Sequence, residues 1–363
     1  MIILGIETSC DETSAAIIEA DPKLKTVKLL SNVVATSLSL HAKTGGIIPE
    51  NAAREQIKYI IPVMKQAIVN SKLSALSKAE GKIENLDTIA VTVGPGLIGS
   101  LLVGVEIAKT LAYVWNKPII PVNHLLGHIY ANFVHEKSKV KSQKSKLNAK
   151  IEFPAIALIV SGGHTDLVLM KKHGSLVWLG GTRDDAAGEA LDKIGRLLNI
   201  PYPAGPKIEK LAKNGNPKAF NFPRPMIDSH DFDLSFSGLK TAVFRQVKTI
   251  EQLDNKTIIN ICASVQQAIV DVLVKKTLSA AQKYRVKSIL LGGGVAANQK
   301  LRDEFNSSLI LNHLSLKFFA PAKNFCTDNA AMIATTAFFN YKAVPWTKID
   351  ANPELDFDSK IKA

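Results

Sequence analysis

The chain has 363 residues, of which 46% are apolar and 21% charged, so it is long enough for two lobes with separate cores and has the composition of a soluble α/β protein. Its formal net charge of +13 attracts polyanions and makes nucleic acid the first partner to expect, although a lysine-rich genome would give the same bias. Three widely spaced cysteines, no signal-peptide pattern and no uncharged apolar stretch of about 18 residues argue against a disulfide framework, a secretory leader and a membrane span. We therefore expect a cytoplasmic protein.

Two strand–turn–strand segments of the chain resemble each other. In each, an apolar run that suits a buried strand leads through a polar turn into a second apolar run. The segments cover residues 2–18 and 155–169, with turns at residues 7–14 and 161–165. Such turns expose backbone N–H groups and hydroxyls, which suits an anionic ligand, although each alone can be an ordinary hairpin. The duplication favours two lobes of similar topology that face each other across a cleft.

Between these segments, helices and strands are predicted to alternate. Apolar residues at helical spacing predict helices over residues 49–72 and 97–115. Buried strands are predicted over residues 86–93 and 117–122, and the first of them ends in Gly94-Pro95-Gly96. The second strand leads directly into the stretch that carries the most specific chemistry.

That stretch, residues 122–133, reads V-N-H-L-L-G-H-I-Y-A-N-F and places His124 and His128 four residues apart. If it is helical, both imidazoles lie on one face, one turn apart, where they can bind a single cation. Neutral imidazole is a common ligand of zinc and iron. The same spacing also occurs in polar stripes without a metal, so the pattern alone leaves both interpretations open.

The second half of the chain begins with a Lys-rich insert. Residues 135–150 carry six lysines among polar residues, which predicts a solvated loop or, alternatively, a contact with a phosphate backbone. Acidic residues over 184–193 lead into an amphipathic helix, and Asp192 lies too far inside it to be explained as a partner of the helix dipole. Residues 258–283 are predicted to form one long helix or two.

The last part combines a Gly run with a further helix start. The predicted strand 286–291 runs into residues 292–298, G-G-G-V-A-A-N, which is a nucleotide-phosphate arrangement but neither a Walker A nor a G-x-G-x-x-G motif. A strand at residues 316–320 precedes a helix that opens near Cys326. Asp328 would either cap this helix or point across the cleft as a third metal ligand.

Nine short motifs together resemble one known family. In chain order they are I-E-T-S-C-D-E-T-S, H-A-K-T-G-G-I-I-P-E, G-P-G-L-I-G-S-L-L-V-G, N-H-L-L-G-H-I, V-S-G-G-H-T, D-A-A-G-E-A-L-D-K, F-S-G-L-K-T-A-V, G-G-G-V-A-A-N and C-T-D-N-A-A-M-I-A. They resemble the bacterial and mitochondrial tRNA N6-adenosine threonylcarbamoyltransferases, once described as O-sialoglycoprotein endopeptidases, from Ile2 to about Thr336.

The resemblance implies an α/β, two-lobed actin-like, sugar-kinase-like and Hsp70-like fold, in which each lobe is a ribonuclease-H-like mixed sheet flanked by helices. We expect an N-terminal lobe over residues 1–121, with the C-terminal helix of about 327–345 packed back on it. A C-terminal lobe over 122–326 would hold the metal and nucleotide site. The Lys-rich surface insert would cover 136–150, and an extended tail would cover 346–363.

The resemblance also implies a reaction, the transfer of threonylcarbamoyl from threonylcarbamoyl-AMP to N6 of the adenosine 3′ of the anticodon. The tRNAs are those that read codons beginning with A, and AMP is released. By the same likeness His124, His128 and Asp328 would hold one divalent metal per subunit, iron or, as the second choice, zinc. The positions that match the donor-binding residues are Ile159, Val160, Ser161, Gly162, Gly163, Asp192, Gly205, Glu209 and Asn298.

No covalent enzyme nucleophile is needed, because the donor is a mixed anhydride with a good leaving group. A general base that receives the N6 proton would help, and Asp11, Glu12 and His164, on the two turns, are the candidates. The chain departs from the family pattern at Gln56, where relatives commonly carry His. A proton or metal role is therefore in doubt at that position.

The resemblance further implies partners: tRNA, a paralogous actin-fold dimerisation subunit and a small P-loop ATPase, or else a homodimer. One rival is an actin-fold kinase or ATPase module with a similar nucleotide cleft, and another is a non-catalytic tRNA-binding scaffold. A zincin-type peptidase is disfavoured because Leu125 follows His124, where the H-E-x-x-H motif requires the catalytic Glu.

Overall fold

A computed structural model describes residues 1–73, 85–134 and 150–357, and it divides into two compact units. The first unit joins Met1–Ala149 to Thr327–Ala363, and the second unit is Lys150–Cys326. The first unit therefore extends beyond the expected boundary at residue 121 and includes the two-histidine stretch. The reason lies in long-range packing, because the segment after residue 327 returns to the first sheet and contacts the helix that follows residue 123. The Lys-rich insert lies outside the described residues except for Lys150, and the last six residues of the expected tail lie outside them as well.

The first unit is built on a five-stranded mixed sheet with the order β3-β2-β1-β4-β5. The strands are β1 (Ile2–Glu7), β2 (Glu12–Asp21), β3 (Thr26–Thr36), β4 (Thr88–Gly94) and β5 (Ile119–Asn123). β1, β2 and β3 pair antiparallel, whereas β4 and β5 continue the sheet in parallel with β1. Both β1 and β4 are almost completely buried, as their continuous apolar sequences predict for central strands.

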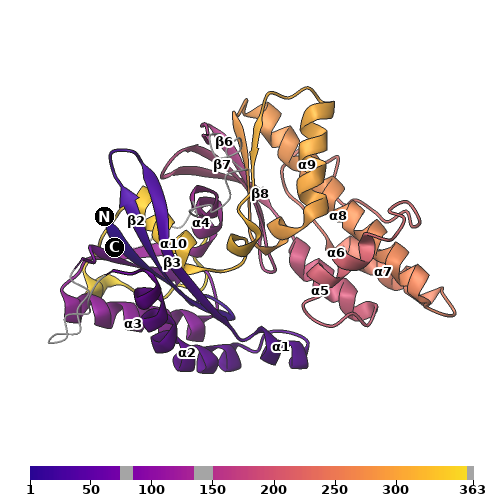
Figure 1. Ribbon diagram of the computed structural model, residues 1–363. Coiled ribbons are helices and arrows are strands. Elements are labelled where there is room, and N and C mark those ends of the chain that lie inside the picture. Colours follow the sequence, from indigo (N-terminus) through magenta and orange to yellow (C-terminus); the bar gives the residue numbers. More distant parts are fainter. Residues whose placement is uncertain (74–84, 135–149, 358–363) are drawn as a thin grey trace. The chain divides into compact units, whose positions relative to one another are not determined.

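Helices cover both faces of this sheet (Figure 1). They are α1 (Leu38–Thr44), α2 (Pro49–Asn70), α3 (Ile98–Trp115), α4 (His124–Tyr130) and α10 (Ala330–Phe339), with short 3-10 turns η1 (Ala131–Phe133) and η5 (Trp346–Lys348). Leu4 and Ile6 of β1 share a core with α2 and α3, whereas Gly5, on the opposite face, lies against α10. A Cβ atom at Gly5 would lie 2.4 Å from the carbonyl oxygen of Ala330, so this glycine allows the close approach. The alternation of a strand places Glu7 on the same face as Gly5.

The second unit repeats the sheet pattern with the order β10-β9-β6-β7-β8. Its strands are β6 (Ala155–Val160), β7 (Thr165–Lys172), β8 (Ser175–Gly181), β9 (Ser288–Gly292) and β10 (Lys317–Phe319). Again the first three strands in sequence pair antiparallel, and the last two continue in parallel. The two strand–turn–strand segments thus occupy equivalent places in two sheets of the same topology.

The helices of the second unit contribute to one large apolar core. They are α5 (Ala187–Leu197), α6 (Gly205–Ala212), α7 (Ser237–Lys248), α8 (Asn255–Lys283) and α9 (Gln299–Leu311), with 3-10 turns η3 (Gly294–Ala297) and η4 (Lys323–Phe325). The segment predicted as one helix or two is the single helix α8. The helix start predicted after the Gly run is only a 3-10 turn, and Asn298 then caps α9 through the N–H of Leu301.

Two of these helices, α3 and α8, are long and apolar enough to cross a bilayer by length and composition alone. Both contain charged residues, among them Glu106 and Lys109 in α3 and Asp271 in α8, so the expectation of no uncharged apolar stretch of about 18 residues is not contradicted. Both helices nevertheless contribute residues to the hydrophobic cores, with 61% of the most apolar window of α8 and 33% of that of α3 buried. Core helices of globular folds pass the same length test, so their packing accounts for this composition.

Candidate metal centre and ligand-binding turns

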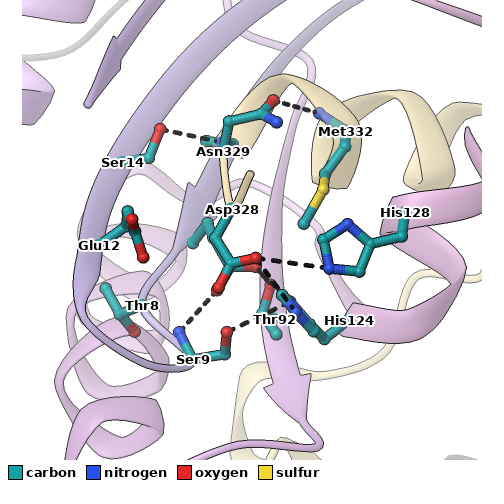
Figure 2. A network of polar contacts seen from close by, with 12 residues as sticks. Thr8, Ser9, Glu12, Ser14, Thr92, His124, His128, Asp328, Asn329 and Met332 are labelled. Carbon is teal, nitrogen blue, oxygen red and sulfur yellow. Dashed lines mark hydrogen bonds and ion pairs between the residues drawn. The ribbon is translucent and has the colours of Figure 1, made fainter. Parts of the chain in front are cut away.

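Three potential metal ligands meet in the first unit. His124 and His128 lie one turn apart on α4, which begins at His124 because the side chain of Asn123 accepts the N–H groups of Leu125 and Leu126. Asp328 precedes α10 and directs Oδ1 to His124 Nε2 at 3.5 Å and to His128 Nε2 at 3.4 Å. Figure 2 shows this carboxylate facing both imidazoles, and one ligand atom from each residue lies within 4.8 Å of the others. These separations suit a single cation with ligand bonds of about 2 Å.

Asp328 does not cap the helix that follows it. The N-cap of α10 is Asn329, whose side chain accepts the N–H of Met332 at 3.1 Å. Ser14 Oγ accepts the N–H of Ala330 at 2.9 Å and ties this helix start to β2. Of the two interpretations of Asp328 left open by the sequence, helix capping is therefore wrong. The carboxylate faces the histidines instead.

A buried glutamate holds the far side of His124. Nδ1 of His124 lies 3.2 Å from Glu7 Oε2 and 3.2 Å from Ser9 Oγ, while Glu7 also accepts the N–H of Ser9 at 2.6 Å and the hydroxyl of Thr92. Carboxylates that bind the second nitrogen of a ligating histidine fix its tautomer and leave the other lone pair directed at the metal. In the neutral tautomer that donates Nδ1–H to Glu7, the free lone pair of His124 would lie on Nε2, which faces Asp328. This arrangement fits the requirement of a metal ligand.

Glu7 was not among the residues expected from the sequence to serve the site. Its side chain is completely buried at the end of an otherwise apolar strand. The signal that could have found it is its place two residues after Gly5, on the face of β1 that α10 covers. A carboxylate is rarely placed there unless it has polar or charged partners.

The electrostatics of the cluster also fit a cation. Burial alone would lower the pKa of His124, but the carboxylates of Asp328 and Glu7 raise it to about 9. Burial raises the pKa of Asp328 to about 6, with Glu7 and Asp11 adding to the rise and His124 opposing it. Burial, Asp328 and Asp11 also raise the pKa of Glu12 well above its ordinary value. Several carboxyl groups thus repel one another in a region of low dielectric constant, and a divalent cation would relieve this repulsion.

The candidate bases occupy both units. Asp11 and Glu12 lie beside the metal ligands, Asp11 on the turn between β1 and β2 and Glu12 at the first residue of β2 (Figure 2 shows Glu12 near Asp328). His164 belongs to the second unit and closes the turn between β6 and β7, where its N–H donates to Ser161 Oγ and its carbonyl accepts the N–H of Ser161.

The turn after β6 presents open backbone. Ile159 and Val160 have fully buried side chains, so only their main-chain atoms are available to a ligand. Gly162 and Gly163 are exposed, and no atom lies within 4 Å of the place that a Cβ atom would take at either residue. The start of α5 lies directly behind this turn, because a Cβ atom at Gly188 would be 2.5 Å from the carbonyl oxygen of Ser161. The N-terminus of a helix beside bare N–H groups favours an anionic group.

The other expected donor-binding residues are linked to this turn through helix starts. Asp192 of α5 accepts the N–H of Ala204 at 2.7 Å and that of Gly205, where α6 begins. Burial raises the pKa of Asp192 in spite of these hydrogen bonds. Glu209, one turn further along α6, accepts the N–H of Gln299 at 2.9 Å, next to Asn298. The second unit therefore gathers the starts of α5, α6 and α9 near the ends of β6 and β9.

Comparisons with known proteins identify the family. A family model described as tRNA N6-adenosine threonylcarbamoyltransferase matches residues 28–335. A protein of that name from Moorella thermoacetica is 45% identical over 97% of this chain and 96% of its own length, and one from Thermosipho africanus is 46% identical over 94% and 95%. A third, from Syntrophomonas wolfei, is 44% identical over 94% of this chain and 92% of its own length. The chain belongs to this family.

Solved structures support the fold of this threonylcarbamoyltransferase family member. Full-length HypF in the phosphate- and nucleotide-bound form has a TM-score of 0.54 at 11% identity, and T. kodakarensis HypF has one of 0.57 at 14%. Each match covers 93% of this chain but only 55% and 47% of the HypF chains, so the chain spans about half their length. At such identities the likeness concerns the fold alone. The expected α/β architecture, an actin-like fold of two lobes with a mixed sheet in each, is confirmed.

Proposed function

We propose that this chain transfers a threonylcarbamoyl group to N6 of an adenosine in tRNA. The observation that carries the proposal is the family match over residues 28–335, joined by relatives of that name at 44–46% identity. In the finer form of the proposal, the donor is threonylcarbamoyl-AMP and the acceptor is the adenosine 3′ of the anticodon, in tRNAs that read codons beginning with A.

The reaction is an acyl transfer in which N6 attacks the carbamoyl carbon of the donor. A C–N bond forms, the C–O bond to the phosphate breaks, AMP leaves, and N6 gives up one proton. An adenine amine is a weak nucleophile, so placement of the two reactants contributes most, and proximity can lower such a barrier by roughly 7–11 kcal/mol. The enzyme therefore needs firm donor binding, a polarised carbonyl group and a proton acceptor.

His124, His128 and Asp328 would hold one divalent metal, iron or else zinc, which their nitrogen and oxygen atoms suit. When bound, such a cation would polarise a carbonyl oxygen and orient the donor. Glu7 and Ser9 keep His124 in the required tautomer through Nδ1. The surrounding residues thus keep the ligand atoms in place before any substrate arrives.

The adenylate part of the donor is proposed to bind to the second unit. The exposed turn at Gly162 and Gly163, backed by the start of α5, offers N–H groups to a phosphate. The carboxylates of Asp192 and Glu209 lie at the starts of α6 and α9, and carboxylate oxygens are suitable acceptors for the hydroxyl groups of a ribose. Gly205 leaves room there, since a Cβ atom at this residue would approach only Leu191, at 3.8 Å.

The proton from N6 is proposed to pass to a carboxylate on the turn between β1 and β2. Glu12 is favoured by its place beside Asp328 (Figure 2), with Asp11 next to it in sequence. His164 of the second unit is the alternative acceptor. Positioned bases of this kind contribute about 10²–10⁴-fold to a rate.

The test combines the transfer assay with metal analysis. Purified wild-type protein is given threonylcarbamoyl-AMP and tRNA, with its protein partners where required, and modified adenosine, AMP release and ATP hydrolysis are measured. We expect equal amounts of modified adenosine and AMP, and about one metal per chain. His124→Ala and Asp328→Ala should lose the metal and slow transfer at least about 100-fold, because a Lewis acid contributes several kcal/mol.

His230→Ala and Asp350→Ala, which change exposed residues of the same types, serve as matched controls and should behave as wild type. ATP hydrolysis without any modification of tRNA would favour the kinase or ATPase reading instead. Full activity in metal-free His124→Ala would show that the metal has no part in the reaction.

We further propose that the chain works in the cytoplasm with a protein partner, a paralogous actin-fold subunit and a small P-loop ATPase, or with a second copy of itself. Large apolar residues are exposed on neighbouring helices α2 and α3, notably Ile57 at 65%, Ile98 at 49% and Tyr113 at 67%. Gly99 of α3 lies against Ala53 of α2, which places the exposed starts of both helices side by side. Exposed apolar faces of this kind often form protein interfaces, and Ile57→Glu should dissociate the assembly in light scattering.

A further inference from the structure

A buried glutamine of α2 holds the turn that supports the metal centre. Gln56 is 1% exposed, and its Nε2 donates to the backbone carbonyl oxygens of Thr8 at 3.2 Å, Cys10 at 2.9 Å and Glu12 at 3.1 Å. Since all three partners can only accept, the amide nitrogen must face the turn. One side chain therefore spans the whole turn between β1 and β2.

Helix α3 holds the middle of the same turn. Ser100 Oγ donates to the carbonyl of Cys10 at 3.1 Å, and the N–H of Leu97 donates to the carbonyl of Ser9 at 2.8 Å. Gly104 allows this approach, because a Cβ atom there would lie 2.3 Å from Thr8 Oγ1. These contacts reach the centre of the turn, whereas Gln56 also reaches its two ends, at Thr8 and Glu12.

The other side of the turn faces the metal ligands. Ser9 Oγ lies 3.2 Å from His124 Nδ1, and the N–H of Ser9 donates to Glu7, which contacts the same nitrogen. Gln56 thus bonds the two residues that flank Ser9 in sequence, Thr8 and Cys10, and Ser9 in turn contacts His124. A shift of the turn would displace Ser9 and rotate the imidazole away from Asp328.

We propose that Gln56 is a positioning residue of the metal centre, an inference that rests on the proposed function. It fixes the turn from behind, so that Ser9 and Glu7 hold His124 in the orientation for metal binding. The Gln56 amide carries no titratable group, so its hydrogen bonds to the turn do not depend on pH.

The test measures metal affinity directly. Purified metal-free wild type, Gln56→Met and Gln66→Met are titrated with Co²⁺, and binding is followed by visible absorption. Gln56→Met keeps the length of the side chain without its donors, and we expect about tenfold weaker Co²⁺ binding, the lower end of what outer partners of ligating histidines contribute. Gln66, on the exposed side of the same helix, bonds only Asn70 among the described residues, so Gln66→Met should bind Co²⁺ as wild type does.

A second variant keeps the test decisive. Gln56→His retains at least one donor, so its Co²⁺ affinity should lie between those of wild type and Gln56→Met. If Gln56→Met does not fold, weaker Co²⁺ binding by Gln56→His alone supports the proposal. Wild-type Co²⁺ affinity in folded Gln56→Met, or in Gln56→His when only that variant folds, overturns it, even if the melting temperature falls. A wild type that binds Co²⁺ but transfers nothing would sink the proposed function while leaving this assignment intact.

Discussion

The two units share one sheet topology but use the same strand end differently. Written from one edge of each sheet to the other, the orders β3-β2-β1-β4-β5 and β8-β7-β6-β9-β10 match, and so do the strand directions. After β1 the turn is packed and hydrogen-bonded to α2, α3 and His124. After β6 the equivalent turn exposes Gly162 and Gly163 to open space.

This difference follows from residue type, not from topology. Ser9 and Glu7 bring side chains that contact Nδ1 of His124, a proposed metal ligand. The glycines of the second turn bring only main-chain N–H groups, which suit a phosphate. Carboxyl ends of strands are where open α/β sheets place ligands.

The units also share one packing device. A Cβ atom at Gly96, after β4, would lie 2.5 Å from the carbonyl oxygen of Ser9, and one at Gly293, after β9, would lie 2.3 Å from that of Val160. In each sheet, therefore, the chain leaving the fourth strand passes directly against the end of the first. The glycines allow this close approach in both units, although the turn after β1 is packed and the turn after β6 is exposed.

The largest effect of these three, on metal affinity, should come from the buried carboxylate of Glu7, beside the packed turn after β1. Glu7→Gln leaves His124 without its anionic partner, and we expect metal affinity to fall about 10–100-fold, as for other partners of ligating histidines. Glu106→Gln, an exposed change on α3, is the matched control. Equal metal affinity in Glu7→Gln and wild type, measured by titration of the metal-free proteins, would remove Glu7 from the site.

The sequence predicted the parts of this picture that depend on local patterns. Continuous apolar runs identified β1 and β6, and the four-residue spacing of His124 and His128 indicated a shared helix face, which α4 provides. The sequence left Asp328 as either a helix cap or a third ligand, and the resemblance of nine motifs favoured the ligand role, because no spacing rule connects Asp328 to residues about 200 positions earlier. Only the fold brings it there, through the return of α10 to the first sheet.

What could not be predicted depends on tertiary burial. The contacts of Glu7 and Gln56 could not be predicted from the sequence, because only the packing of α10 on one face of β1 and of α2 on the other makes these residues hydrogen-bonded and inaccessible to water. The unit boundary was misplaced for the same reason, since α4 packs against α10. Long-range contacts of this kind leave no periodic signal in the chain.

An intermediate effect, on donor KM or on stability, should distinguish the exposed Gly163 from the tightly packed Gly293 in the second unit. Gly163→Val adds a side chain where no atom lies within 4 Å, so stability should be unchanged while KM for the donor rises about tenfold, equivalent to about 1.4 kcal/mol. Gly293→Ala should instead lower the stability and leave the KM for the donor unchanged, because the φ of 91° at this residue and the contact with Val160 make a Cβ atom cost about 1–3 kcal/mol. Steady-state kinetics and thermal unfolding separate the two. An unchanged KM in Gly163→Val would exclude this turn as the donor site.

The smallest effect concerns how the units cap their helices. In the first unit α4 is capped by its own neighbour Asn123, whereas α7 of the second unit is capped from a distance by Asp184. One oxygen of Asp184 accepts the N–H groups of Phe236 and Ser237 at 2.7 and 3.1 Å, and the other accepts the hydroxyls of Ser235 and Ser237. Partial burial raises the pKa of this carboxyl, but these hydrogen bonds outweigh it and hold the pKa below its ordinary value.

A lowered pKa in the folded state means that the carboxylate stabilises the fold only when ionised. Its contribution is complete above the pKa of the unfolded chain, about 4, and is lost as the pH falls below that value towards the folded-state pKa. Asp184→Asn should therefore cost about 0.5–1 kcal/mol at pH 7, because asparagine still accepts hydrogen bonds, and clearly less at pH 3, as measured by hydrogen exchange of the α7 amides. Asp350→Asn, at an exposed position, should cost nothing at either pH. A cost for Asp184→Asn that stays the same at both pH values would mean that α7 is held by packing and not by this charge.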